Sequence, residues 1–380
     1  MIADEAPGEK ADEAGWEPAP PSARRRLLLQ RGAVGSGALA APTLAAFSAV
    51  SQALPAAQAQ AREKTRTPAA AILPDDEPFW FGFIGDTPYS RLEEGALRQV
   101  LAAMSAEPLA FVLHVGDIKS RTESCDDYLL SSRLELLDQC PHPLILTPGD
   151  NDWTDCTGPG WPATDELARL ERLQWLRLHA YRRSQSLGLR RMTLHQQGPY
   201  LPDRFQGAGS DRPRLPENLR WRIGSLQCCT LHVVGSNNAS RRKPQLEQAW
   251  LLRQQANGDW LNETVELAVR DKAKGLVIAL HANMRFENGR SDGWERMREL
   301  VVAAAVAFDG PVLLLHGDTH YFRSDRLLLR SHGLANFRRV ECFGSPFSSS
   351  WIQIRWNPSL ARSGVGVESD PFLISSRALP

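Results

Sequence analysis

The chain has 380 residues, and its 44 basic and 44 acidic side chains give a formal net charge of zero. A balanced charge provides no global field that would attract nucleic acid or an acidic membrane surface, so we expect neither as a partner. The length exceeds what one ordinary domain requires, and the excess lies at the N-terminal end.

Three segments precede the predicted domain. Residues 1–23 are rich in Ala, Pro, Asp and Glu and carry too few large apolar side chains to offset the entropy of ordering, so we expect them to be disordered. Residues 24–61 open with three arginines, continue through a weakly apolar region and end on small residues, which resembles a twin-arginine export signal. Residues 62–77 contain prolines and charges and are predicted to be a linker.

The predicted signal indicates where the mature protein acts. Cleavage after Ala59 or Ala61 would follow passage through the twin-arginine translocase and leave a periplasmic or secreted protein without a stable membrane span. An uncleaved membrane anchor is the alternative. Pro42 and Pro55 disfavour it because they interrupt an apolar run that barely reaches spanning length.

The cysteines fit an oxidising compartment. Six are present, and we favour a disulfide between Cys125 and Cys156, because it would bridge two loops that follow predicted strands. Zinc binding is the competing interpretation, but no pair of cysteines has the CxxC spacing of a zinc site. The connectivity of all six cysteines stays open.

The mature chain begins with two strand–helix–strand units. Apolar runs predict strands over 79–84, 111–115 and 144–147, and helical patterns near 92–104 and 126–138 lie between them. Strands joined by such crossovers pair in parallel.

The middle of the chain is predicted to be a helix followed by an irregular segment. Thr164 is placed to cap a helix whose buried stripe we expect to comprise Leu167, Leu170, Leu173 and Leu176. Residues 186–220 are rich in Gly, Pro and Arg without a clear period, and we interpret them as an insertion or lid that could contain a small hairpin.

The remaining chain supplies a second set of strands and helices. Strands are predicted over 221–223, 226–234, 275–281, 312–316 and 351–356, and helices near 245–255, 260–269 and 294–308. Two sets of strands with helices outside them indicate one domain of two packed sheets.

Six of the apolar runs end on a polar residue. The residues are Asp86, Asp117, Asp150 and Asp318, each preceded by glycine, together with His281 and Asn237. A single Gly-Asp pair is usually an ordinary turn. Because buried strands are short apolar runs and ligands bind beyond their carboxyl ends, six such endings, joined by His320, predict one site.

Carboxylate and imidazole ligands in this mixture suit divalent Mn, Fe or Zn, and one carboxylate between two ions can bridge them. Two ions about 3.5 to 4 Å apart clamp a phosphoryl group and lower the pKa of bound water. The residue types therefore favour metal-dependent phosphoester chemistry.

The order GD, GD, GDND, H and GDTH resembles the five-block pattern of the calcineurin-like metallophosphoesterase superfamily, which includes the purple acid phosphatases. The resemblance covers residues 79–322, and the phrases at 148–156 and 233–238 are similar to those of an exported bacterial subgroup. It implies an α/β fold, a four-layer α/β/β/α sandwich of two mixed β-sheets flanked by helices. We expect this domain over 78–360, followed by a tail over 361–380.

The resemblance also implies a dinuclear centre of two divalent ions, Mn, Fe, Zn or Ca, in which a metal-bound hydroxide hydrolyses a small-molecule phosphoester. Matched block by block, the metal ligands are Asp86, Asp117 as the bridge, Asp150, His281, Asp318 and His320. Pro88, Asn151 and Asp318 stand where the superfamily usually has histidine. Metal binding tolerates these exchanges better than acid catalysis does.

Candidates for catalysis follow from these departures. With the third-block histidine replaced, Asn151, Asp152 and His316 are the catalytic candidates, and Asn237 and Asn238 are candidates for binding substrate. For His316, support of a metal ligand and a purely structural hydrogen bond are equally open.

Two other functions stay open. A catalytically degenerate, metal-stabilised binding protein of the cell envelope would keep the ligands without turnover, as the lost histidine allows. A cell-envelope nuclease would need a basic groove, which the zero net charge does not support.

Overall fold

The computed structural model describes residues 73–157, 166–198, 213–240, 244–288, 292–361 and 370–379. The chain divides into two compact units, Met1–Pro42 and Thr43–Pro380, and every described residue belongs to the second. The predicted disordered segment, the export signal and Thr164 lie outside the described residues.

The first sheet has five strands in the order β12-β11-β1-β2-β3. They are β1 (Phe79–Ile84), β2 (Leu109–His114), β3 (Leu144–Leu146), β11 (Ser350–Trp356) and β12 (Phe372–Ala378). The first three pair in parallel, and β11 and β12 add antiparallel strands at one side. The parallel strands are continuous apolar runs because both of their faces are covered.

The second sheet has seven strands in the order β4-β5-β6-β7-β8-β10-β9. They are β4 (His195–Gln196), β5 (Leu219–Ile223), β6 (Leu226–Thr230), β7 (Gly275–Ala279), β8 (Val312–His316), β9 (Arg323–Asp325) and β10 (Phe337–Glu341). The four central strands are parallel and the outer ones antiparallel, so both sheets are mixed.

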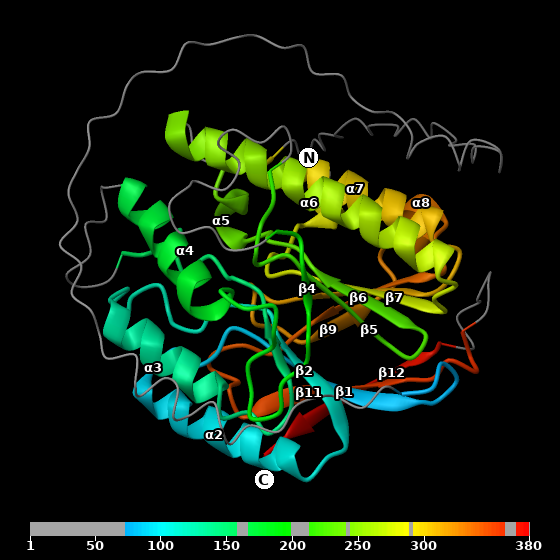
Figure 1. Ribbon diagram of the computed structural model, residues 1–380, viewed down its shortest axis with the longest axis horizontal. Helices are drawn as coiled ribbons and strands as arrows, with labels where there is room; N and C mark the ends of the chain where they lie inside the picture. The colour runs from blue at the N-terminus through cyan, green and yellow to red at the C-terminus, as the bar shows by residue number, and fades with distance from the viewer. Residues whose placement is uncertain are drawn as a thin grey trace, which may run out of the picture. The chain divides into compact units, whose positions relative to one another are not determined.

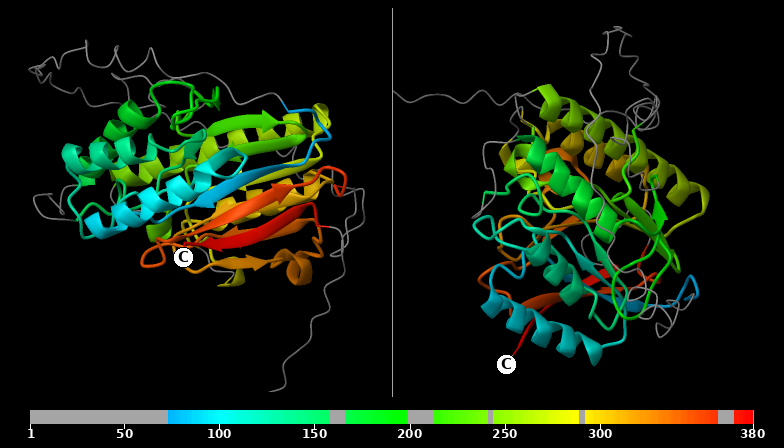
Figure 2. Two further views of the ribbon diagram at one scale, coloured as in Figure 1. Left: turned by 90° about the horizontal axis from the view of Figure 1, so that it is seen from below. Right: turned by 60° about the vertical axis from the view of Figure 1, so that its left-hand side comes forward.

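Helices cover the outer face of each sheet (Figures 1 and 2). Those on the first sheet are α2 (Arg91–Ser105) and α3 (Asp127–Leu137), and those on the second are α6 (Pro244–Arg270) and α7 (Glu295–Ala307). Shorter or peripheral helices are α4 (Glu166–Ala180), α5 (Gly235–Asn238), α8 (Leu328–His332) and a 3-10 turn at Phe286–Asn288.

Alternate residues of the second sheet face two different cores. Val277 and Leu313 belong to the cluster between the sheets, whereas Ile278 and Leu314 pack with α6 and α7. Phe111 joins the sheets, because its ring stacks on Phe81 of β1 at 4.7 Å and meets Trp221 of β5 edge-on at 5.5 Å. The predicted four-layer α/β/β/α sandwich is therefore confirmed.

Two helical predictions require correction. The predicted helices near 245–255 and 260–269 form one helix, α6, which continues through Gly258. The missing side chain at Gly258 lets Leu300 of α7 approach to 3.1 Å from where a Cβ would be. In α4, Leu170 and Leu173 are buried as expected, because they pack in a small apolar cluster with Trp153. Leu167 lies outside that cluster and is 52% exposed.

Two segments expected to be irregular contain strands. Within the predicted insertion at 186–220, Leu187 bridges Leu144 and β4 pairs with β5, while 199–212 lies outside the described residues. Beyond position 360, β12 pairs along the whole of β11 and so extends the sheet past the predicted domain end. Its side chains are mostly half-exposed or exposed, which leaves no apolar run to recognise.

None of the helices in the described part of the chain combines the length and the apolar character that crossing a membrane requires.

Candidate metal centre

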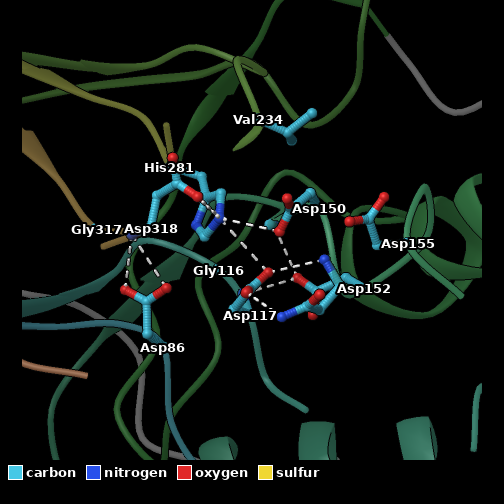
Figure 3. Close-up of polar contacts among 12 residues, drawn as sticks. Asp86, Gly116, Asp117, Asp150, Asp152, Asp155, Val234, His281, Gly317 and Asp318 are labelled. Carbon is cyan, nitrogen blue, oxygen red and sulfur yellow. Dashed lines mark hydrogen bonds and ion pairs between the residues drawn. The ribbon is translucent and has the colours of Figure 1, made fainter. Parts of the chain in front are cut away.

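The carboxyl ends of strands from both sheets meet at one place (Figure 3). Asp86, Asp117 and Asp150 follow β1, β2 and β3 of the first sheet, and His281 and Asp318 follow β7 and β8 of the second. Their ligand atoms form two groups within 4.8 Å, one of Asp86, Asp117 and His281 and one of Asp150, His281 and Asp318. The structure thus brings together five of the six predicted ligands.

His281 lies at the centre of these groups with one nitrogen directed at the carboxylates. Its Nδ1 donates to the carbonyl oxygen of Val115 at 2.8 Å, which leaves Nε2 facing the acidic side chains. Nε2 lies 3.4 Å from Asp150 Oδ1 and 3.5 Å from Asp117 Oδ1. A backbone carbonyl that orients the imidazole in this way is typical of histidines that bind metals.

His320, the sixth predicted ligand, is oriented by the same device. Its Nδ1 donates to the carbonyl oxygen of Ser345 at 2.7 Å, and its Nε2 lies 3.6 Å from Asp86 Oδ1. The side chains of His320 and Asp318 are 26% and 20% exposed, so solvent reaches the cluster from their side.

Asp117 is the side chain that two ions could share. One imidazole nitrogen holds only one ion, whereas a carboxylate offers two oxygens. Asp117 Oδ1 faces His281 at 3.5 Å, and its Oδ2 accepts a hydrogen bond from the Tyr89 hydroxyl at 2.6 Å. The Tyr89 hydroxyl is in turn 3.2 Å from His320 Nε2, so Asp117 faces His281 through one oxygen and is linked to His320 through Tyr89 on the other.

Two glycines leave space for the carboxylates of the cluster. A Cβ on Gly235 would lie 2.4 Å from Asp318 Oδ1 and 2.5 Å from Asp150 Oδ2, and one on Gly317 would lie 2.1 Å from Asp86 Oδ2. Any side chain at these positions would occupy the space that the carboxylates now fill.

The backbone at the ligands is strained. Asp86, Asp117, Asp318 and His320 have φ angles of 52°, 59°, 83° and 67°, in the left-handed region that L-residues rarely adopt. Strain of this kind persists where the surroundings enforce it and clusters at functional sites.

The cluster concentrates negative charge in a buried position. Burial raises the pKa of Asp318 to about 7, repulsion by Asp150 and Asp86 adds to the shift, and His281 opposes it. Burial also raises the pKa of Asp117 well above its usual range. Burial lowers the pKa of His281, but the surrounding carboxylates outweigh it and raise that pKa well above its ordinary value.

The donor set fits divalent cations. His281 Nε2 is buried and makes no hydrogen bond within the described residues, although carboxylate oxygens surround it. Cations placed among these oxygens would offset their repulsion and lower the pKa of each carboxyl group. Oxygen-rich surroundings with two imidazoles suit Mn, Fe or Zn.

Asp152 differs from the catalytic role expected for it. The side chain is fully buried, its Oδ1 accepts from the Ile118 amide at 2.9 Å, and its Oδ2 accepts from the amides of Gly149 and Asp117 at 2.7 and 3.1 Å. Its carboxylate therefore links the backbone after β2 to the backbone after β3 and is not accessible to solvent.

Asn151, another catalytic candidate, points into the cluster. Its side-chain Nδ2 donates to Asp117 Oδ2 at 2.5 Å and to the Tyr89 hydroxyl at 3.0 Å, while its backbone amide donates to Asp117 Oδ1 at 2.9 Å.

His316, the other catalytic candidate, is buried, and its Nδ1 donates to the carbonyl oxygen of Gly317 at 2.9 Å. Burial lowers the pKa of His316 to about 3, so the ring is neutral and holds the turn that leads to Asp318.

The two asparagines proposed to bind substrate are engaged with the protein. Asn237 donates to Ser240 Oγ at 2.7 Å and accepts from the Gly293 amide at 2.9 Å. Asn238 is buried and donates to Gln254 and to the Gly293 carbonyl oxygen. Both therefore hold the loop that carries Gly235.

Three residues at the site were not among the predicted ones. Tyr89 reaches Asp117 through the turn before α2, and Cys342 Sγ donates to Asp86 Oδ2 at 3.6 Å. Glu341 is fully buried and accepts hydrogen bonds from the amide and the hydroxyl of Thr319, the residue between Asp318 and His320. The spacing of Tyr89, three residues after Asp86, is the one feature that could have indicated a role.

The predicted disulfide between Cys125 and Cys156 is confirmed, with a Cα–Cα distance of 5.7 Å. It joins the segment before α3 to the loop after β3, so it fixes the third block beside the second. The four other cysteines are free and buried.

No protein-family model matches the chain, and no curated protein matches it. Solved structures with a similar fold include a purple acid phosphatase from yellow lupin (Lupinus luteus) seeds, with 11% identity over 80% of this chain and a TM-score of 0.40. A dimetal phosphatase from Danio rerio has 12% identity over 78% of this chain and 99% of its own, with a TM-score of 0.42.

A third similar structure is the 5'-nucleotidase of Candida albicans, with 8% identity over 80% of this chain and a TM-score of 0.42. The chain spans 55% of the lupin protein and 51% of the Candida protein. At these identities the likeness concerns the fold alone.

Proposed function

We propose that the chain is a phosphoester hydrolase of the calcineurin-like metallophosphoesterase superfamily with a dinuclear metal centre. The observation that carries the proposal is the position of Asp117 in a buried cluster, where its carboxylate lies within 4.8 Å of Asp86 and His281 and is linked through Tyr89 to His320. No feature of the described residues favours a binding protein without turnover over this proposal.

Each half of the cluster would hold one divalent ion. Asp86, Asp117 and His320 would bind the first, and Asp117, Asp150, His281 and Asp318 the second. When bound, such ions polarise a phosphoryl oxygen and lower the pKa of water. The abundance of carboxylate oxygen favours hard ions such as Mn over softer ones.

The chain's own donors complete the site. Asn151 Nδ2 and the Tyr89 hydroxyl are directed at the shared carboxylate, where a phosphoryl oxygen would approach. Burial and the nearby carboxylate of Asp117 raise the pKa of Tyr89, so its hydroxyl keeps its proton. Their protons are donated to Asp117 and to each other, so we infer that these two groups hold the shared carboxylate in position for the ions.

We further propose that residues 24–61 direct export through the twin-arginine translocase and are removed, which leaves a periplasmic or secreted enzyme. The disulfide between Cys125 and Cys156 supports this proposal, because disulfides persist in oxidising compartments. Fractionation of cells that express the full chain tests it, and a mature protein retained in the cytoplasm would contradict it.

Hydrolysis assays test the enzymatic proposal. The chain from residue 62, loaded with Mn, Zn or Fe, should hydrolyse a phosphomonoester or a phosphodiester, and Asp117→Asn should abolish turnover with every metal. Asp271→Asn, which neutralises an exposed aspartate at the opposite edge of the sheet, is the charge-matched control. Metal bound without hydrolysis of either ester would reject the hydrolase and revive the binding protein.

A further inference from the structure

Exposed aromatic side chains gather beside the metal cluster. Four aromatic residues of the described chain are exposed, namely Tyr128, Tyr321, Phe322 and Phe347, at 77%, 66%, 38% and 48%. All except Tyr128 lie within two residues of His320 or Ser345. Exposed apolar side chains that cluster on one part of a surface often mark a binding site.

Two loops that hold the cluster carry these rings. Tyr321 and Phe322 follow His320 directly. The second loop is fixed to the first, because Ser345 donates its amide to the Asp86 carbonyl oxygen at 2.9 Å and accepts from His320 Nδ1 at 2.7 Å. Phe347 stands two residues farther on.

The rings differ in how far the protein already uses them. Phe322 stacks on Phe343 at a centroid distance of 5.1 Å and an interplanar angle of 17°, so one of its faces is taken. Tyr321 and Phe347 are more exposed than Phe322 and keep more ring surface in contact with water. Tyr321 follows His320 directly, and the Phe347 amide donates to the carbonyl oxygen of Gly344, whose added Cβ would lie 2.9 Å from the His320 ring.

We propose that Tyr321 and Phe347 form a subsite for a planar aromatic group carried by the phosphoester, so that the preferred substrates are aryl or nucleoside phosphates. The inference rests on the proposed function. An aromatic group joined to the phosphate would lie against these rings while the phosphoryl group occupies the metal cluster. A small hydrated group such as glycerol would gain nothing from ring contact.

Binding of two phosphonates that are not hydrolysed tests the subsite directly. Phenylphosphonate should bind the metal-loaded protein more tightly than methylphosphonate. Tyr321→Ala and Phe347→Ala should each weaken phenylphosphonate by about 3- to 10-fold, the range of one aromatic contact, and leave methylphosphonate unchanged. Tyr321→Phe keeps the ring and should retain the preference, and Tyr128→Ala, which removes an exposed ring from α3, is the matched control.

Kinetics give an independent reading. For phenyl phosphate the two alanine variants should raise KM with little change in kcat, whereas for glycerol phosphate neither constant should change. Equal binding of the two phosphonates by the unaltered protein, or variants that leave the ratio unchanged, would overturn the subsite. Absence of hydrolysis of every ester would instead reject the proposed function, and the phosphonate ratio would still decide the subsite.

Discussion

Replacing Gly235 by alanine should weaken the binding of one metal ion without replacing any of its proposed ligands. Gly235 lies behind two carboxylates that approach from different sheets, Asp150 and Asp318. Its φ does not lie in the left-handed region, so the new methyl group acts by contact alone.

The size of the effect follows from the distances. The added Cβ would lie 2.4 Å from Asp318 Oδ1, and real Cβ contacts are essentially never shorter than 3.0 Å, so the oxygen must retreat by at least 3.0 − 2.4 = 0.6 Å. Metal–ligand distances tolerate about 0.2 Å. We therefore expect the second ion to bind about 100-fold more weakly, at the upper end of what disturbed support of a metal ligand costs.

Thermal denaturation with added metal measures this change. At a free metal concentration 100 times its Kd, the unaltered protein gains about 2.7 kcal/mol of stability, and a variant with 100-fold weaker binding gains about 0.4 kcal/mol. Gly95→Ala is the matched control, since apart from its own helix backbone no atom of the described residues lies within 4 Å of its added Cβ. A Gly235→Ala protein that binds two ions as tightly as the unaltered one would refute the reasoning.

Three further predictions concern other parts of the site and its support. Tyr89→Phe removes the hydroxyl that binds Asp117 at 2.6 Å and should lower kcat about 10-fold or more, as loss of a hydrogen bond to a charged group does; unchanged steady-state kinetics would contradict it. Burial lowers the pKa of His232 from 6.5 to about 4, so below pH 6.5 the unfolded chain binds a proton at this residue that the folded chain does not. The free energy of unfolding of the metal-free protein should therefore fall by about 3 kcal/mol between pH 6.5 and 4, relative to that of His232→Asn. Urea denaturation that shows the same pH dependence in both proteins would count against it. Removing the disulfide with Cys125→Ser and Cys156→Ser opens a loop of sequence separation 31 and should cost about 3 to 4 kcal/mol, and an unaltered Tm would contradict that.

The convergence of the ligands could be predicted because each follows a buried strand. Such strands are recognisable as short apolar runs, and the runs before Asp86, Asp117 and Asp318 have that form. Once strands of one sheet pair in parallel, their carboxyl ends meet at one edge, so residues far apart in sequence become neighbours.

The roles of individual polar residues could not be predicted from that pattern. Asp150 and Asp152 are two positions apart in the sequence. Nothing in the sequence indicates that Asp150 faces the cluster while Asp152 accepts hydrogen bonds from three backbone amides. Glu341 is the last residue of β10 and accepts a hydrogen bond from the Thr319 amide, which follows β8. The two residues are neighbours only because β8 pairs with β10. Tertiary packing decides both cases.

The central claim is that two ions share Asp117. Electron paramagnetic resonance of the Mn²⁺-loaded protein tests it most directly, because ions about 3.5 to 4 Å apart and joined by a carboxylate couple magnetically. We predict an exchange-coupled spectrum at two ions per chain, which Asp117→Asn converts to the signal of isolated Mn²⁺. A spectrum of isolated ions in the unaltered protein at full loading would contradict the shared centre.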